Sequence, residues 1–167
     1  MAVYHFTYHA YRSWRPDHPR GYTKGEQILP SDRERAASYD RKAYQPPVRF
    51  DRFIQSVLVW GAYDICQRRG WRLHSAATDP THLHVVVSWR GFIPWKDVRD
   101  RMKNVLSYLL GRATGQQGRR WFVRDASRRR VERRSHFDYL MDEYHPDHRG
   151  VKWREGMPAP VAPPGVE

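Results

Sequence analysis

The sequence contains a single cysteine, Cys66, among 167 residues, and this scarcity excludes several classes of protein. One thiol cannot build an intramolecular disulfide framework or a cysteine-based zinc site. Because Cys66 lies within an apolar pattern of helical spacing, we expect it to be a buried thiol in a reducing compartment.

Long apolar runs and a secretory pattern are missing as well. No stretch has the length and apolar character of a membrane-spanning helix, and no polybasic amphipathic helix suggests an interfacial segment. The first residues, from Met1 to His5, lack the pattern of a signal peptide. These features predict a cytoplasmic protein that has no membrane partner.

Acidic residues are few relative to basic ones. There are 30 Lys and Arg against 18 Asp and Glu, which gives a formal net charge of +12. An excess of this size favours a polyanionic partner, most plausibly nucleic acid. The hydrophobic content of 40% and the aromatic content of 14% are typical of a folded protein rather than a disordered one.

The length and the distribution of proline predict one domain with a short tail. We expect a single domain over residues 1–155, in which residues 13–47, rich in Pro, Gly and charge, form an insertion-like excursion. The Pro-rich stretch 156–167 is predicted to be a disordered tail.

The spacing of apolar residues predicts alternating strands and helices. Strands are expected over residues 3–11, 71–78, 82–88 and 121–123. Helices are expected over 31–44, where Ser31 and Glu34 offer a capping box, over 50–69, from Pro94 onward, and from Ser135 to Pro146. This order predicts an α+β fold with a ferredoxin-like antiparallel sheet and helices packed on one of its faces.

The motif His82-Leu83-His84 is the first candidate for chemistry. It opens a strand after the turn signal Asp79-Pro80-Thr81, and alternate side chains of a strand share a face. The two imidazoles therefore point the same way and can chelate a metal ion. The alternative is that both are ordinary residues of a half-exposed sheet, and the motif alone does not decide between them.

The C-terminal helix carries the second candidate. Its packed face should consist of Phe137, Leu140, Met141 and Tyr144, which follow helical spacing. Tyr139 and Glu143 lie one turn apart on the opposite side, so Tyr139 is an aromatic residue that the core does not require.

The alternative for Tyr139 and Glu143 is a surface tyrosine beside a surface glutamate. Tyr144 is expected to pack rather than to react. His145 and His148 follow the helix end and are expected to face solvent. His5 and His9 share one face of the first strand, where they could border the metal ion or have an ordinary, partly buried role.

An arginine-rich stretch with interleaved aromatics precedes this helix. Arginine pairs with phosphate in a bidentate manner and stacks on bases, so the stretch predicts contacts with a nucleic-acid backbone. The alternative is a solvated basic face. The candidate nucleic-acid-binding residues are Arg119, Arg120, Arg124, Arg128, Arg129, Arg130, Arg133 and Arg134.

Together these features resemble the IS200-like, single-tyrosine (Y1) transposases, including the REP-associated tyrosine transposases, of the HUH (His-hydrophobic-His) superfamily. The resemblance rests on the His82-Leu83-His84 strand, the intervening helix, the Tyr139 helix and the basic charge, and it spans residues 4–153. Two departures are the length of the 13–47 excursion and His145-Pro146, where REP-associated relatives often carry Asn-Pro.

The resemblance implies a metal-dependent endonuclease and strand transferase that acts on single-stranded DNA with hairpin structure, and hence a protein that is nucleoid-associated when bound to DNA. His82 and His84 would bind one Mg²⁺ or Mn²⁺ ion with Glu143 as a third ligand, and Tyr139 would be the nucleophile that forms a 5′-phosphotyrosine. Relatives act as dimers or monomers, so a homodimer is an open alternative.

Two other functions remain open from the sequence. One is a non-catalytic nucleic-acid-binding protein on the same scaffold, and the other is a metal-dependent phosphoesterase that uses water in place of tyrosine.

Overall fold

A five-stranded antiparallel sheet forms the centre of the computed structural model, which describes residues 1–13, 15–24, 27–124 and 126–166. The strand order is β6-β1-β5-β4-β7, and each neighbouring pair is antiparallel. The strands are β1 (Ala2–His9), β4 (Arg72–Thr78), β5 (His82–Trp89), β6 (Ser127–Val131) and β7 (Lys152–Arg154). The predicted α+β class with an antiparallel sheet is confirmed.

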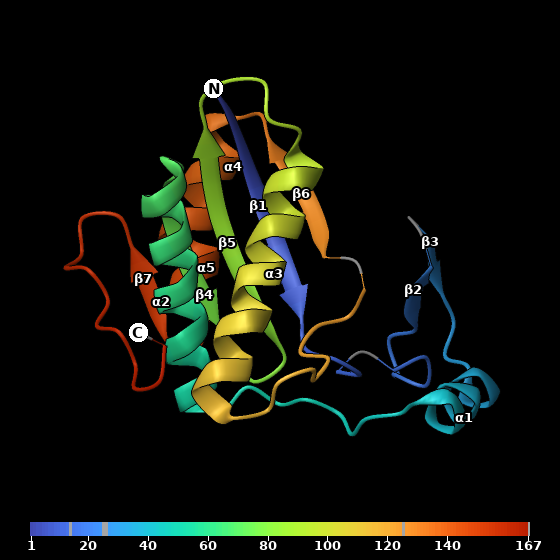
Figure 1. The fold of residues 1–167 in the computed structure, drawn as a ribbon. Helices are drawn as coiled ribbons and strands as arrows, with labels where there is room; N and C mark the ends of the chain where they lie inside the picture. The colour runs from blue at the N-terminus through green and yellow to red at the C-terminus, as the bar shows by residue number, and fades with distance from the viewer. Residues whose placement is uncertain (14, 25–26, 125, 167) are drawn as a thin grey trace.

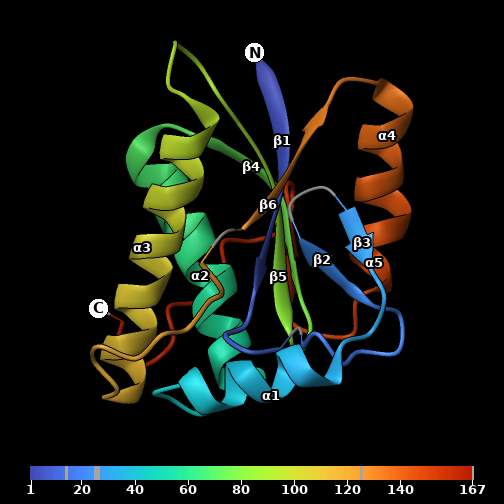
Figure 2. The same cartoon turned by 90° about the vertical axis from the view of Figure 1, so that its right-hand side faces the viewer.

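Two long helices cover one face of the sheet. They are α2 (Arg52–Arg69) and α3 (Trp95–Thr114), and Figures 1 and 2 show them side by side on that face. Asp51 caps α2 by accepting a hydrogen bond from the Ile54 N–H, and Gly70 ends it at a φ of 65°. The core lies between these helices and strand residues of one parity, among them Phe6 and Leu83, both fully buried.

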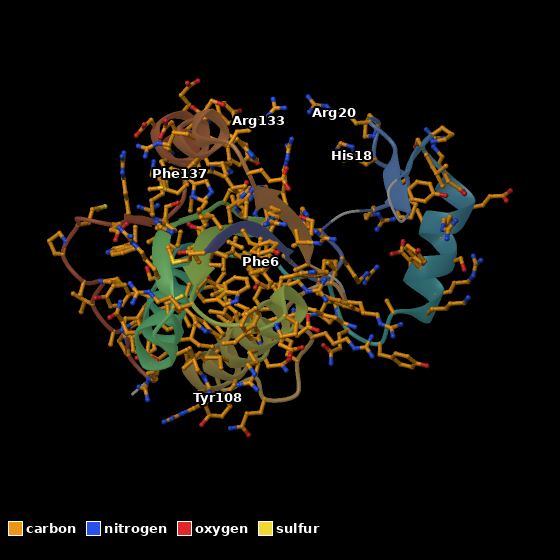
Figure 3. All side chains as sticks on the ribbon, turned by 90° about the horizontal axis from the view of Figure 1, so that it is seen from above. Phe6, His18, Arg20, Tyr108, Arg133 and Phe137 are labelled. Carbon is orange, nitrogen blue, oxygen red and sulfur yellow. The ribbon has the colours of Figure 1, made fainter. Side chains whose placement is uncertain are left out.

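The C-terminal helical segment lies against the opposite face. It consists of α4 (Arg134–Tyr139), the π-helical segment η1 (Leu140–Tyr144) and the short α5 (His145–Asp147). Figure 2 shows α4 and α5 across the sheet from α2 and α3, and in Figure 3 Phe137 and Tyr108 lie on opposite sides. The expectation of helices on one face therefore holds for the two long helices but not for this segment.

The excursion forms a small lobe beyond the β6 edge of the sheet. It contains β2 (Tyr22–Lys24), β3 (Gln27–Leu29) and α1 (Arg33–Lys42), which stand apart from the sheet in Figure 1. The predicted helix is present, but its N-cap is Asp32 rather than Ser31, and the Asp32 carboxylate accepts from the Arg35 N–H. The lobe leaves and rejoins the domain at adjacent points, because the Val48 N–H donates to the Tyr11 carbonyl at 2.9 Å.

One local expectation needs correction. The segment 121–123 makes an isolated bridge between Phe122 and Ala10, and the strand at that edge of the sheet is β6, within the arginine run. In the Pro-rich stretch 156–167, Val166 is only 4% exposed and packs in the core, while residue 167 lies outside the described residues. Disorder of the tail stays a prediction. Among the described helices, none combines the length and apolarity needed to cross a membrane.

Candidate functional site

Six histidines gather on the sheet face that the C-terminal segment covers. The β1–β5 register pairs Thr7 with His84 and His9 with His82, so these side chains share a face with His5. The segment above adds two more histidines. The cluster consists of His5 and His9 from β1, His82 and His84 from β5, and His145 and His148 from the C-terminal segment.

Three of these imidazoles form a candidate metal site. His82, His84 and His148 each offer a nitrogen, and the three nitrogens lie within 4.8 Å of one another. Two nitrogens bound to one tetrahedral ion at about 2.0–2.1 Å are roughly 3.3 Å apart, so small side-chain adjustments suffice for metal binding. The residues present therefore fit a divalent ion.

Hydrogen bonds orient two of the three rings. The Nδ1 atom of His148 lies 2.7 Å from the Tyr144 carbonyl oxygen, to which it can only donate. The Nδ1 atom of His84 lies 2.9 Å from the Thr7 hydroxyl, which can accept its proton. With their protons on Nδ1, both rings present an Nε2 lone pair, the form that binds a metal ion.

His82 is held by a carboxylate. Its Nε2 atom lies 2.9 Å from an Asp79 carboxylate oxygen, and its Nδ1 atom lies 2.9 Å from the Thr81 hydroxyl. Burial alone would raise the pKa of Asp79, but hydrogen bonds from His82 and Thr81 hold that pKa well below its ordinary value. Asp79 is therefore an anion that fixes the first ligand of the group.

Burial keeps the deeper histidines neutral. Desolvation, with repulsion from neighbouring histidines, lowers the pKa of His84 far below its ordinary value. Burial also lowers the pKa of His5 to about 4 and that of His145 to about 3. At neutral pH these rings are uncharged and carry a lone pair.

The structure corrects the expected position of the last two histidines. His145 is only 3% exposed, and its Nδ1 atom lies 2.8 Å from the Ser75 hydroxyl on β4. Its Nε2 atom lies 3.4 Å from Nε2 of His5. His148 is half-buried in the metal group, so neither residue simply faces solvent.

Tyr144 is the tyrosine that contacts the histidines. Its hydroxyl lies 3.4 Å from Nε2 of His84, and its ring centroid lies 4.9 Å from that of His148. Burial raises the pKa of Tyr144, with further contributions from Tyr139 and Asp79. We expected Tyr144 to pack in the core, but it is only partly buried and its polar end reaches the metal group.

Tyr139 and Glu143 lie farther from the metal group. Tyr139 is 46% exposed, and its ring centroid is 6.0 Å from that of Tyr144. Glu143 is exposed and does not belong to the metal group found among the described residues, in which His148 takes the third place. The predicted roles of Tyr139 and Glu143 remain predictions.

A π-helical segment changes the helical phase within the predicted helix from Ser135 to Pro146. The His145 N–H donates to the Leu140 carbonyl five residues earlier, so η1 holds one more residue than an α-helical turn. One extra residue rotates all later side chains by roughly 100° about the axis. Tyr144 and His148 have the same i, i+4 spacing as Tyr139 and Glu143. This spacing is the sequence signal by which Tyr144 and His148 could have been identified as a pair.

The eight predicted arginines separate into three places. Arg129 of β6 pairs directly with His5 across the strands, and its charge helps to lower the pKa values of His5 and His136. Arg128 stacks on Trp95 at 4.2 Å, on the other face, while Arg130 is exposed. Arg134, which pairs with Asp138 at 2.7 Å, lies at the start of α4 beside Arg133.

The remaining three arginines line a basic cavity between the excursion and α3. The cavity has a volume of about 760 Å³, and its described lining includes no acidic residue. Its cations come from both sides, and Tyr11, Tyr39 and Trp121 add aromatic surface. The basic lining residues are Arg12, Lys42, Lys103, Arg119, Arg120 and Arg124.

Comparison with known proteins gives a structural similarity without a sequence match. No family model and no curated protein matches the chain. Among solved structures, the chain is similar to a REP-associated tyrosine transposase bound to a REP hairpin, with 9% identity and a TM-score of 0.47. The similarity covers 83% of this chain and 61% of the other, so the chain spans about three fifths of the length of that transposase.

Proposed function

We propose that the protein cleaves and rejoins single-stranded DNA by metal-assisted attack of a tyrosine on a phosphodiester. The observation that carries this proposal is the Tyr144 hydroxyl, 3.4 Å from Nε2 of His84 at a group of three histidines. A nucleophile beside a candidate metal site, together with a net charge of +12, is the combination that phosphodiester chemistry requires.

The ion and the side chains would have separate roles in the reaction. A divalent ion held by His82, His84 and His148 would neutralise charge on the scissile phosphate and orient the phosphorus. The Tyr144 oxygen forms a bond to phosphorus as the bond from phosphorus to the 3′ oxygen breaks. The phenol loses one proton and the departing 3′ oxygen gains one, which leaves a 5′-phosphotyrosine and a free 3′-hydroxyl. One phosphoester replaces another, so the free hydroxyl can reverse the step and rejoin strands.

Tyr139 is the second candidate nucleophile. Its side chain is 46% exposed and therefore open to an incoming strand, and it precedes Glu143 by the spacing typical of the single-tyrosine transposases. We assign the attack to Tyr144 because its hydroxyl contacts a metal-group histidine, whereas the ring of Tyr139 packs behind it at 6.0 Å.

The substrate path follows the arginines. Arg129 lies beside the histidine face, and its proximity to His5 supports a proposed contact with the phosphate that reacts. The basic cavity that contains Arg119, Arg120 and Arg124 offers cations and aromatic rings, which suit the backbone and bases of an unpaired strand.

The test is formation of a covalent adduct. Purified protein is incubated with labelled single-stranded DNA hairpins and Mn²⁺ or Zn²⁺, and an SDS-stable protein–DNA band is sought. We expect the band with wild type and with Tyr139→Phe, and its loss with Tyr144→Phe.

Each other result has a distinct meaning. Loss of the band with Tyr139→Phe alone would transfer the attack to Tyr139. Cleavage that survives the double variant would exclude a tyrosine mechanism and favour attack by water. Retarded DNA that is never cut would favour the non-catalytic binding protein.

A further inference from the structure

The candidate metal group is built from nitrogen alone. Among the residues that the structure describes, the group consists of three imidazoles, His82, His84 and His148, and includes no carboxylate. Mg²⁺ is a hard cation that prefers oxygen ligands and gives up its waters reluctantly. Imidazole ligands suit Zn²⁺ and its neighbours among the first-row transition metals.

We infer that the ion bound by His82, His84 and His148 is an imidazole-preferring transition metal ion, represented by Zn²⁺ or Co²⁺, and not Mg²⁺. The inference rests on the proposed function only in taking these three residues as the ligands. It disagrees with the Mg²⁺ that resemblance to the single-tyrosine transposases implies.

The hydrogen bonds around the group support a nitrogen-ligated ion. His148 donates its Nδ1 proton to the Tyr144 carbonyl, and the Thr7 hydroxyl lies 2.9 Å from Nδ1 of His84, where it can accept that proton. Such outer partners are typical of zinc-binding histidines, because they fix the tautomer and the direction of the lone pair.

Asp79 supplies the third outer partner and is a positioning residue. Its carboxylate lies 2.9 Å from His82 and also accepts hydrogen bonds from the backbone N–H groups of Thr81 and His82. A carboxylate held in this way orients the imidazole and makes it a stronger ligand, as in the carboxylate–histidine pairs of zinc sites. Both ring nitrogens of His82 have a partner, so this role of Asp79 requires the ion to displace the Thr81 hydroxyl from Nδ1.

Three protein ligands would also leave one coordination position of the ion free for a substrate. A four-coordinate ion with three imidazoles keeps one open position, and such ions can expand to five ligands. A phosphate oxygen can take the open position, and the Tyr144 hydroxyl lies close enough to His84 to approach the same phosphate.

The inference is tested by direct metal binding to the full-length chain after removal of metal with EDTA. Calorimetric titrations with Zn²⁺, Co²⁺, Mn²⁺ and Mg²⁺ need no DNA and no activity. We expect one Zn²⁺ per chain, bound at least about 1000-fold more tightly than Mg²⁺, as nitrogen ligands predict. The visible absorption of the Co²⁺ form should show four or five ligands; equal affinity for Mg²⁺ and Zn²⁺ would overturn the inference.

Three variants locate the ion and separate ligand from positioning roles. His148→Ala should lower Zn²⁺ affinity by about 100-fold or more and change the Co²⁺ spectrum, and Asp79→Asn should lower the affinity by roughly 10- to 100-fold without changing the ligand count. Glu143→Gln is the matched control and should bind like wild type. A large loss with Glu143→Gln and none with His148→Ala would contradict the assignment.

This test is independent of the covalent-adduct assay. If the chain binds Zn²⁺ through His148 but forms no adduct, the inference about the metal stands and the proposed nucleophile is wrong. If the chain forms the adduct with Mg²⁺ alone and does not bind Zn²⁺, the proposed function stands and the inference about the metal is wrong.

Discussion

At the scale of single residues, the histidine cluster makes the fold sensitive to acid. Burial depresses the pKa values of His5 and His145 to about 4 and about 3, against an ordinary value of 6.5. The unfolded chain therefore binds more protons than the folded chain between pH 6.5 and these values. By linkage, stability is complete above pH 6.5 and declines as the pH falls.

We expect the metal-free protein to lose about 1.4 kcal/mol of unfolding free energy per pH unit within this window for each buried histidine of lowered pKa, His84 included. The measurement is urea denaturation in EDTA at several values between pH 7.5 and pH 5. His145→Gln should make the decline shallower, because one of the groups that take up a proton on unfolding is gone.

Gln117→Ala, at an exposed residue without a titratable side chain, is the control and should leave the slope as it is in wild type. A wild-type stability that stays flat from pH 7.5 to pH 5 would show that the two rings are not held neutral by the fold.

At the scale of elements, the π-helical segment sets the register of the site. It turns Tyr144, His145 and His148 toward the sheet, while Glu143 remains exposed. Removing one residue from η1 would restore α-helical spacing and rotate the following side chains by roughly 100°.

We therefore expect deletion of Glu143 to lower Zn²⁺ affinity by about 100-fold or more while the helical content, followed by circular dichroism, stays close to wild type. Glu143→Ala removes the same side chain but keeps the residue count, so it should bind Zn²⁺ normally. Normal binding by the deletion variant would mean that the π-helical turn does not position His148.

The C-terminal helical segment separates the part of the site that could be predicted from the sequence from the part that could not. The strand with His82 and His84 was predictable, because alternation along a strand fixes which side chains share a face. The third ligand was not predictable from spacing: resemblance implied Glu143, which stays a prediction, whereas the structure brings His148 beside His82 and His84. A π-helical turn depends on tertiary packing and leaves no periodic signal.

Some helices and strands were likewise predictable from the sequence, and others were not. Helices α2 and α3 were predictable from their apolar stripes, and Gly70 marked the end of the first. Strand β6 was not, because Arg128, Arg129 and Arg130 are exposed at an edge and lack the apolar alternation of a half-buried strand. Burial of Val166 was not predictable either, since the prolines around it are typical of a linker.

At the scale of the whole molecule, charge should govern binding to DNA. The net charge of +12 includes Arg120 and Arg124, which line the basic cavity and are exposed. For single strands, each phosphate contact contributes about −0.7 to the slope of log affinity against log salt.

We expect Arg120→Gln with Arg124→Gln to weaken binding to unpaired DNA and to reduce that slope by about 1.4 in magnitude, measured by fluorescence anisotropy over a range of NaCl concentrations. The control replaces Arg68 and Arg69, two exposed arginines at the end of α2, with glutamine. Equal effects of the two pairs would indicate that total charge, rather than the cavity, sets the affinity.

The position of β1 has a consequence for the order in which the protein forms. This first strand pairs with β5 and β6, and His5 meets His145 across 140 positions of the chain. Contacts of such long range close late in folding, because the entropy of a large loop must be overcome first. A nascent chain leaving the ribosome therefore carries His5 while 140 further positions are made, and the histidine cluster is completed only when the C-terminal helical segment has been made.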